Sequence, residues 1–163
     1  MADATPILRL HGLESFPDRA AILESAFAAV AADEGTLWLL DEPQEALVPV
    51  WNSGPNAETF VGKHHQPLSA GLISLVCVSE QAQCENEVYR NVQQDPTLDM
   101  RLGVLTCAMI AAPLRIGGTI RGVVSCVRLK NGADAPDPAP FGPLDLTRVM
   151  EAVEKLGAAL ERA

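Results

Sequence analysis

Apolar residues recur at helical spacing in two long segments, one near each end of the chain. In residues 16–32 they form one face, which predicts a helix with Ser15 as N-cap and Pro17 in the first turn. In residues 143–162 they form a narrow seam, which predicts a second helix. The face comprises Ile22, Leu23, Ala26, Phe27 and Val30; the seam comprises Leu146, Val149, Val153, Leu156 and Leu160.

Extended apolar segments come in two pairs, and each pair is joined by a tight turn. Residues 35–41 and 45–51 flank a short polar turn, and residues 105–116 and 119–129 flank Gly117-Gly118. Such pairs predict two antiparallel hairpins. Between them, residues 69–79 predict a helix and residues 81–85 a short strand, while 86–103 and the proline-rich 131–141 predict irregular connections.

Because the strands come in antiparallel pairs and do not alternate singly with helices, the order of elements predicts an α+β fold. We expect a central antiparallel β-sheet with flanking helices. The 163 residues fit one domain, which we expect to span 1–163. A seam as narrow as that of residues 143–162 packs either on the domain's own sheet or on another helix. From it we predict a homodimer that associates through the two terminal helices.

Charge and hydropathy exclude several classes of partner. Twenty-one acidic against 12 basic residues give a formal net charge of −9, which argues against nucleic acid and against an anionic membrane surface. The longest apolar stretch, 104–114, is far shorter than the roughly 20 residues that cross a bilayer. The first residues lack the pattern of a signal peptide, so we expect a cytoplasmic protein with free thiols.

Three segments resemble the GAF family of sensory domains, which share their general architecture with PAS domains. The first is the hairpin GTLWLLDEPQEALVPVW, and the second is HQPLSAGLISLVCVSEQAQCENEV. The third is an apolar strand with Pro113-Leu114, followed by Gly117-Gly118 and by Ile120-Arg121-Gly122-Val123-Val124. The resemblance covers a core of about 35–129, with the helices 16–32 and 143–162 as flanks.

The resemblance implies a ligand pocket between the sheet and the middle helices, and terminal helices that dimerise and pass signals onward. It therefore implies a sensory or regulatory domain for a small molecule of unknown identity. Because no output domain is visible in the sequence, we expect a protein effector that acts in trans. By family position, with Tyr89 as the best single candidate, the pocket would be lined by Trp51, Leu72, Leu75, Val76, Tyr89, Val92, Thr106 and Ala108, unless these residues are ordinary core.

A thiol-based redox enzyme or switch is the alternative function, because the GAF family includes a free methionine sulfoxide reductase. Cys77 and Cys84 are seven residues apart and would carry that activity, whereas Cys107 and Cys126 are expected in the core. A dimerisation or adaptor module without a ligand is a third possibility. The functional prediction is therefore a non-enzymatic sensor, with thiol redox activity left open.

Other cofactors find little support among the residues. The spacing of the four cysteines does not predict a metal site, and none has the histidine neighbour with which bilin-binding members of the family tether their chromophore. His64 and His65 beside Lys63 are interpreted as an exposed loop, with contact to a ligand as the alternative. Asp95 and Asp99 lie near the place of an acidic motif in cyclic-nucleotide-binding members, but the rest of that motif is absent.

Overall fold

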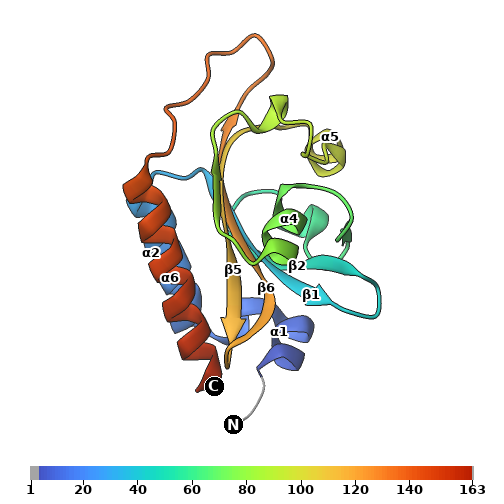
Figure 1. Cartoon of the computed structure of the whole chain (residues 1–163), viewed down its shortest axis with the longest axis vertical. Coiled ribbons are helices and arrows are strands. Elements are labelled where there is room, and N and C mark those ends of the chain that lie inside the picture. Colours follow the sequence, from blue (N-terminus) through green and yellow to red (C-terminus); the bar gives the residue numbers. More distant parts are fainter. Residues whose placement is uncertain (1–3, 163) are drawn as a thin grey trace.

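A six-stranded antiparallel sheet forms the centre of the computed structural model, which describes residues 4–162 (Figure 1). The spatial order of the strands is β3-β2-β1-β6-β5-β4, so the two predicted hairpins, β1–β2 and β5–β6, lie side by side. The α+β class and the antiparallel sheet predicted from the sequence are confirmed. The strands are β1 Glu34–Asp41, β2 Ala46–Asn52, β3 Gln66–Pro67, β4 Gln83–Glu85, β5 Leu105–Ile116 and β6 Thr119–Lys130.

Helices at both ends of the described chain cover one face of the sheet (Figure 1). This first face carries α1 (Thr5–His11), the 3-10 turn η1 (Gly12–Ser15), α2 (Pro17–Ala29) and α6 (Pro143–Glu161). The sequence interpretation missed α1 and η1, and it was wrong about Ser15. Phe16 is the N-cap of α2, because Ser15 still belongs to the preceding 3-10 turn.

The apolar seam of α6 packs inside the chain's own core. Val149, Val153, Leu156 and Leu160 are at most 2% exposed, and α6 lies against both β5 and α2. A Cβ at Gly157 would come within 2.1 Å of the Arg115 carbonyl oxygen, so this glycine lets α6 approach β5 closely. The seam therefore serves the domain's own sheet, and a dimer through α6 would have to use its outer surface.

The second face of the sheet is covered by short helices from the middle of the chain (Figure 1). They are α3 (Ala57–Phe60), α4 (Leu72–Ser79), η2 (Val88–Arg90) and α5 (Thr97–Leu102). The helix predicted over 69–79 is thus present as Leu72–Ser79. Ile73, Ser74 and Cys77 are buried with Leu72 and Val76, whereas Leu75 is half-buried and Ser79 is exposed.

The described strands contain three irregularities of register, and two of them decide on which face of the sheet predicted site residues lie. In β2, Trp38 pairs with Pro49 and Leu37 with Trp51, so Val50 is an extra residue. In β5, Thr106 pairs with Leu129 and Ala108 with Arg128, so Cys107 is an extra residue. Each bulge shifts the alternation of side chains by one position, because successive residues of a regular strand point to opposite faces.

No helix in residues 4–162 combines the length and the apolar character needed to cross a membrane.

Candidate functional site

A small cavity, here called the inner cavity, lies between the second face of the sheet and the helices α3, α4 and α5. Its polar lining comes from strands far apart in sequence but adjacent in the sheet, and from α5. Besides Trp38, this lining includes Glu34, Thr36, Asp99, Thr106 and Ser125. All of the strand residues among them point to the second face of the sheet.

Hydrogen bonds between neighbouring strands hold the floor of the inner cavity in place. Trp38 Nε1 donates to Ser125 Oγ at 3.1 Å, across β1 and β6. Asn52 Nδ2 donates to Thr36 Oγ1 at 2.9 Å, across β2 and β1. All four side chains are at least nine-tenths buried. The indole ring and the two hydroxyls are therefore fixed before any ligand arrives.

Helix α5 forms the roof and is attached through hydrogen bonds of Asp99 and through the partly buried Leu98, which packs against the second core. Asp99 accepts two hydrogen bonds from Thr106, one from its backbone N–H at 2.8 Å and one from Oγ1 at 2.9 Å. None of the six residues of α5 is fully buried, and Met100 is 77% exposed. Because so little apolar surface holds it, α5 is the covering element that can move at the lowest cost.

A second set of hydrogen bonds connects the rim of the cavity. Gln66 Nε2 donates to Asp95 Oδ2 at 2.9 Å, and Gln66 Oε1 lies 3.3 Å from His64 Nε2. His64 Nδ1 in turn lies 3.5 Å from Arg101 Nη1 on α5. His64 is only 4% exposed and sits edge-on to the ring of Trp38, so its interpretation as an exposed loop residue was wrong. His65 is exposed, as expected.

Two carboxylates at the inner cavity are held where ionisation is unfavourable. Burial raises the pKa of Glu34, and the neighbouring charges of Asp33 and Asp99 raise it further. Burial also raises the pKa of Asp99, although the hydrogen bonds from Thr106 oppose this. Asp95 at the rim differs, because hydrogen bonds from Thr97 and Gln66 lower its pKa. The inner cavity thus concentrates negative charge that the surrounding chain only partly stabilises.

The inner cavity encloses about 70 Å³ of free space. That volume accommodates one or two water molecules, each of which occupies roughly 30 Å³ in the liquid. Pockets that bury drug-sized ligands measure about 300–1,000 Å³. A ligand larger than a few heavy atoms therefore requires the roof to move outward, and α5 is the element best suited to do so.

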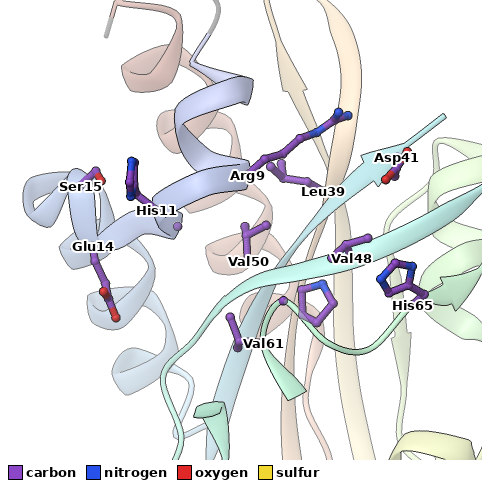
Figure 2. A pocket seen from close by; sticks show the side chains of 13 residues that line it. Arg9, His11, Glu14, Ser15, Leu39, Asp41, Val48, Val50, Val61 and His65 are labelled. Carbon is purple, nitrogen blue, oxygen red and sulfur yellow. The ribbon is translucent and has the colours of Figure 1, made fainter. Parts of the chain in front are cut away.

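A larger hollow, the outer groove, lies on the first face of the sheet between α1, η1, β2 and the loop 61–65 (Figure 2). It measures about 710 Å³ and is open to solvent. Figure 2 shows its charged and polar side chains spread around the rim, with His11 and His65 at opposite ends. Arg9 is engaged with the Leu40 carbonyl oxygen at 2.7 Å. Because its polar groups do not converge, the outer groove is a weaker candidate than the inner cavity.

The structure places only one of the eight predicted site residues, Thr106, in the lining of the inner cavity. Trp51 and Ala108 lie on the first face of the sheet, where Trp51 stacks on Phe27 with ring centroids 6.2 Å apart. The bulges explain this outcome. Thr106 and Ala108 would share a face in a regular strand, and the extra residue Cys107 separates them.

The remaining predicted site residues lie outside the inner cavity. Leu72 and Val76 are buried in the second core, while Leu75 and the 98% exposed Val92 border a surface hollow beside α4. The hydroxyl of Tyr89 donates to Asp137 at 3.0 Å and so connects η2 to the proline-rich loop. Sequence reasoning missed Glu34, Trp38 and Ser125; the alternation of β1 and β6 was the signal that could have found them.

The cysteines of the alternative function do not form a pair. Cys77 belongs to the second core, whereas Cys84 packs against the first core, on the opposite face of the sheet. Burial raises the pKa of both thiols, and it raises that of Cys126 to about 12. Thiolates are the reactive form of cysteine, so these surroundings suppress nucleophilic chemistry. Among residues 4–162, no group of three or more metal-ligating side chains is found either.

Comparison with solved structures identifies the fold. The structure superimposes on a GAF domain of a phosphoenolpyruvate-protein phosphotransferase from Coxiella burnetii with a TM-score of 0.71 and 19% identity, covering 87% of this chain and 79% of that one. The GAF domain of the Acinetobacter phosphotransferase gives 0.69 and 15% identity, with coverage of 100% and 96%. A type II free methionine-R-sulfoxide reductase from Thermoplasma acidophilum gives 0.58 and 15%, with coverage of 88% and 95%.

No protein-family model and no curated protein sequence matches the chain. The likeness therefore rests on three-dimensional structure, at identities that show the fold alone. The order of the strands, the helices on both faces and the superposition agree with the resemblance of residues 35–129. The chain has the fold of a GAF domain.

Proposed function

We propose that this chain is a cytoplasmic sensory domain that binds a small molecule in the inner cavity. The observation that carries the proposal is the convergence of fixed polar groups, from β1, β5 and β6, on one enclosed space under a weakly attached helix. Ligand sites combine apolar walls with a few such converging polar groups. The fold supports the proposal, because the solved structures similar to this chain include a domain of a putative two-component sensor histidine kinase from Sinorhizobium meliloti.

Occupancy of the inner cavity would reach the terminal helices through the sheet. Glu34 and Thr36 face the cavity, while Gly35 between them faces α2. A Cβ on Gly35 would lie 2.2 Å from the ring of Phe27, so β1 and α2 are in tight contact there. Because packed interiors transmit small displacements, a shift of β1 under a bound ligand would move Phe27 and hence α2.

Native mass spectrometry of the full chain tests the proposal. We expect a retained small molecule, and we expect Val127→Phe, which fills the inner cavity from a half-buried position on β6, to abolish it. Val48→Phe is the matched control, since Val48 is also half-buried on a strand but lines the outer groove. Retention of the same molecule by Val127→Phe, or its loss in Val48→Phe alone, would overturn the assignment to the inner cavity. A bare wild-type chain would favour an adaptor module.

The proposal includes a homodimer through the outer surfaces of α2 and α6. Small residues at intervals of four, Ala21, Ser25 and Ala29, line the exposed side of α2 next to Arg148 and Lys155 on α6. Small side chains allow two helices to approach closely. In addition, Arg148 and Lys155 of one copy can face Asp18, in the first turn of α2, of the other copy. A protein effector acting in trans would then read the position of these helices.

Sedimentation velocity across a concentration series tests the dimer. We expect Ser25→Arg to shift the chain to monomer, because the long charged side chain would separate the α2 surfaces. Ala133→Arg, at an exposed position of the loop 131–141, is the control and should sediment like the wild type. A Ser25→Arg chain that sediments as a dimer would place the interface elsewhere.

A further inference from the structure

We propose that the ligand of the inner cavity carries a positive charge: a primary ammonium group attached to a small apolar body. This inference rests on the proposed function and specifies the class of ligand. It follows from the charges that line the cavity, from the hydroxyl oxygens on its floor that can accept a further hydrogen bond, and from the aromatic rings beside them.

All of the ionisable side chains that line the inner cavity are acidic. They are Glu34 at the start of β1, Asp95 at the rim and Asp99 on α5, and no lysine, arginine or histidine lines the cavity. The nearby described cations are engaged elsewhere. Arg101 is directed to His64, and Arg128 donates to backbone carbonyls of residues 30, 31 and 139. A cation is thus the component that the lining lacks.

Glu34 is the carboxylate that most needs a partner. Within residues 4–162, no hydrogen bond or ion pair engages its side chain, although the side chain is only partly accessible to solvent. Gly54 makes room for it, because a Cβ there would lie 1.9 Å from Glu34 Oε2. Asp33 and Asp99 add negative charge near by, and they raise its pKa. A bound ammonium would relieve this repulsion and supply the missing hydrogen bonds.

The floor of the cavity offers hydrogen-bonding capacity that the chain itself leaves unused. Ser125 Oγ accepts the indole N–H of Trp38, and Thr36 Oγ1 accepts the amide of Asn52. Each hydroxyl oxygen keeps a second lone pair, and both residues are more than nine-tenths buried. An ammonium group donates three hydrogen bonds and accepts none, so these lone pairs are acceptors that suit it.

Aromatic rings complete a site suited to a cation with an apolar body. Trp38 and Phe60 both line the inner cavity, with ring centroids 6.5 Å apart and planes tilted by 38°. The negative face of such rings attracts cations, and tryptophan does so most strongly. Ile73 and Met109 add apolar surface beside them. An anionic ligand would instead meet three carboxylates, so the lining selects against phosphates and carboxylic acids.

Three probes of matched size separate charge from shape: n-butylammonium, n-butanol and n-butyrate. Each is titrated into the full-length chain at pH 7 while the indole N–H resonances of both tryptophans are followed by NMR. Trp38 reports on the inner cavity, and Trp51, on the opposite face of the sheet, is the internal control. We expect butylammonium to bind at least tenfold more tightly than butanol, and butyrate to give no saturable shift of Trp38.

Glu34→Gln keeps the size of the side chain and removes its charge. We expect it to weaken butylammonium about tenfold while leaving butanol unchanged, and we expect no effect from Glu58→Gln, which neutralises an exposed carboxylate on α3. Equal or tighter binding of butanol or butyrate at Trp38 overturns the charge inference and leaves the proposed function standing. Both proposals fail if no probe shifts the indole N–H resonance of Trp38 and if Val127→Phe shows the same native mass spectrum as the wild type. The inner cavity would then not be a ligand site.

Discussion

The carboxylate of Asp99 accepts both the backbone N–H and the hydroxyl of Thr106, at 2.8 and 2.9 Å. These two hydrogen bonds connect α5, the roof of the inner cavity, to the first residues of β5. Thr106 can make them because the bulge at Cys107 turns it to the second face of the sheet. The bulge at Cys107 therefore directs Thr106 towards the inner cavity and, through Thr106, holds α5 over it.

Replacing Thr106 by valine should loosen α5 without changing the shape of the side chain. The variant loses the hydroxyl bond but keeps the backbone bond to Asp99, so we expect a loss of about 1 kcal/mol in the free energy of unfolding. Urea denaturation measures this loss, and hydrogen exchange should rise over residues 95–104. Thr147→Val on the exposed side of α6 is the control. Unchanged exchange in 95–104 would show that other contacts hold the roof.

Protonation of Glu34 should increase the free energy of unfolding as the pH falls from neutral. The pKa of Glu34 in the folded state lies above its ordinary value of 4.5. At a pH between the ordinary and the folded pKa, the folded state therefore binds more protons than the unfolded state. The free energy of unfolding decreases as the pH rises through this window. Glu34→Gln should therefore raise the urea midpoint at pH 7, and the gain should shrink towards pH 4.5. A gain that grows on acidification would contradict the assignment.

The four thiols should react slowly with iodoacetamide in the folded chain. All four have raised pKa values, and Cys126 is fully buried with a pKa of about 12. We expect Cys84, the least buried of them, to react first and Cys126 to react only on unfolding. Peptide mass spectrometry at pH 8, with urea-unfolded chain as reference, measures the order. A disulfide between Cys77 and Cys84 after mild oxidation would contradict their placement on opposite faces.

Gly122 should tolerate no side chain. A Cβ there would lie 1.9 Å from the carbonyl oxygen of Trp38 on the neighbouring strand, and backbone cannot yield as a flexible side chain can. We expect Gly122→Ala to cost about 1–3 kcal/mol through overpacking. Gly132→Ala is the matched control, because a Cβ there meets nothing within 4 Å, and its effect should stay within about 0.5 kcal/mol. Equal stability of the two variants would refute this account of Gly122.

Tyr89 should matter for stability more than for ligand retention. Its hydroxyl donates to Asp137, which also pairs with the buried Lys130 at 2.7 Å. Tyr89→Phe should lower the urea midpoint slightly, and Asp137→Ala should lower it more, because Lys130 then loses its partner. Asp134→Ala on the same loop is the control. If Tyr89→Phe no longer retained the small molecule in native mass spectrometry, Tyr89 would be a ligand contact after all.

The sequence alone was sufficient to predict the two hairpins and the two long helices. The Gly117-Gly118 turn has positive φ at both residues, which few other residues adopt, so the hairpin β5–β6 was specified locally. The apolar periodicity of residues 143–162 likewise predicted α6, whose N-terminus is capped by Asp145 accepting the Gly142 N–H at 2.8 Å. Turns and periodicity depend on neighbours in the chain, and they can therefore be recognised in one sequence.

The composition of the inner cavity was decided only by the tertiary structure. A bulge adds one residue to one strand of a pair, and nothing in the local pattern marks Cys107 or Val50 as that residue. The bulge at Cys107 put Thr106 and Ala108 on opposite faces, and the bulge at Val50 put Trp51 on the first face of the sheet. Glu34, Trp38, Asp99 and Ser125 come together through strand pairing and helix packing, which bring distant segments into contact. Sequence periodicity thus determined the elements, while register across the sheet determined which side chains share a cavity.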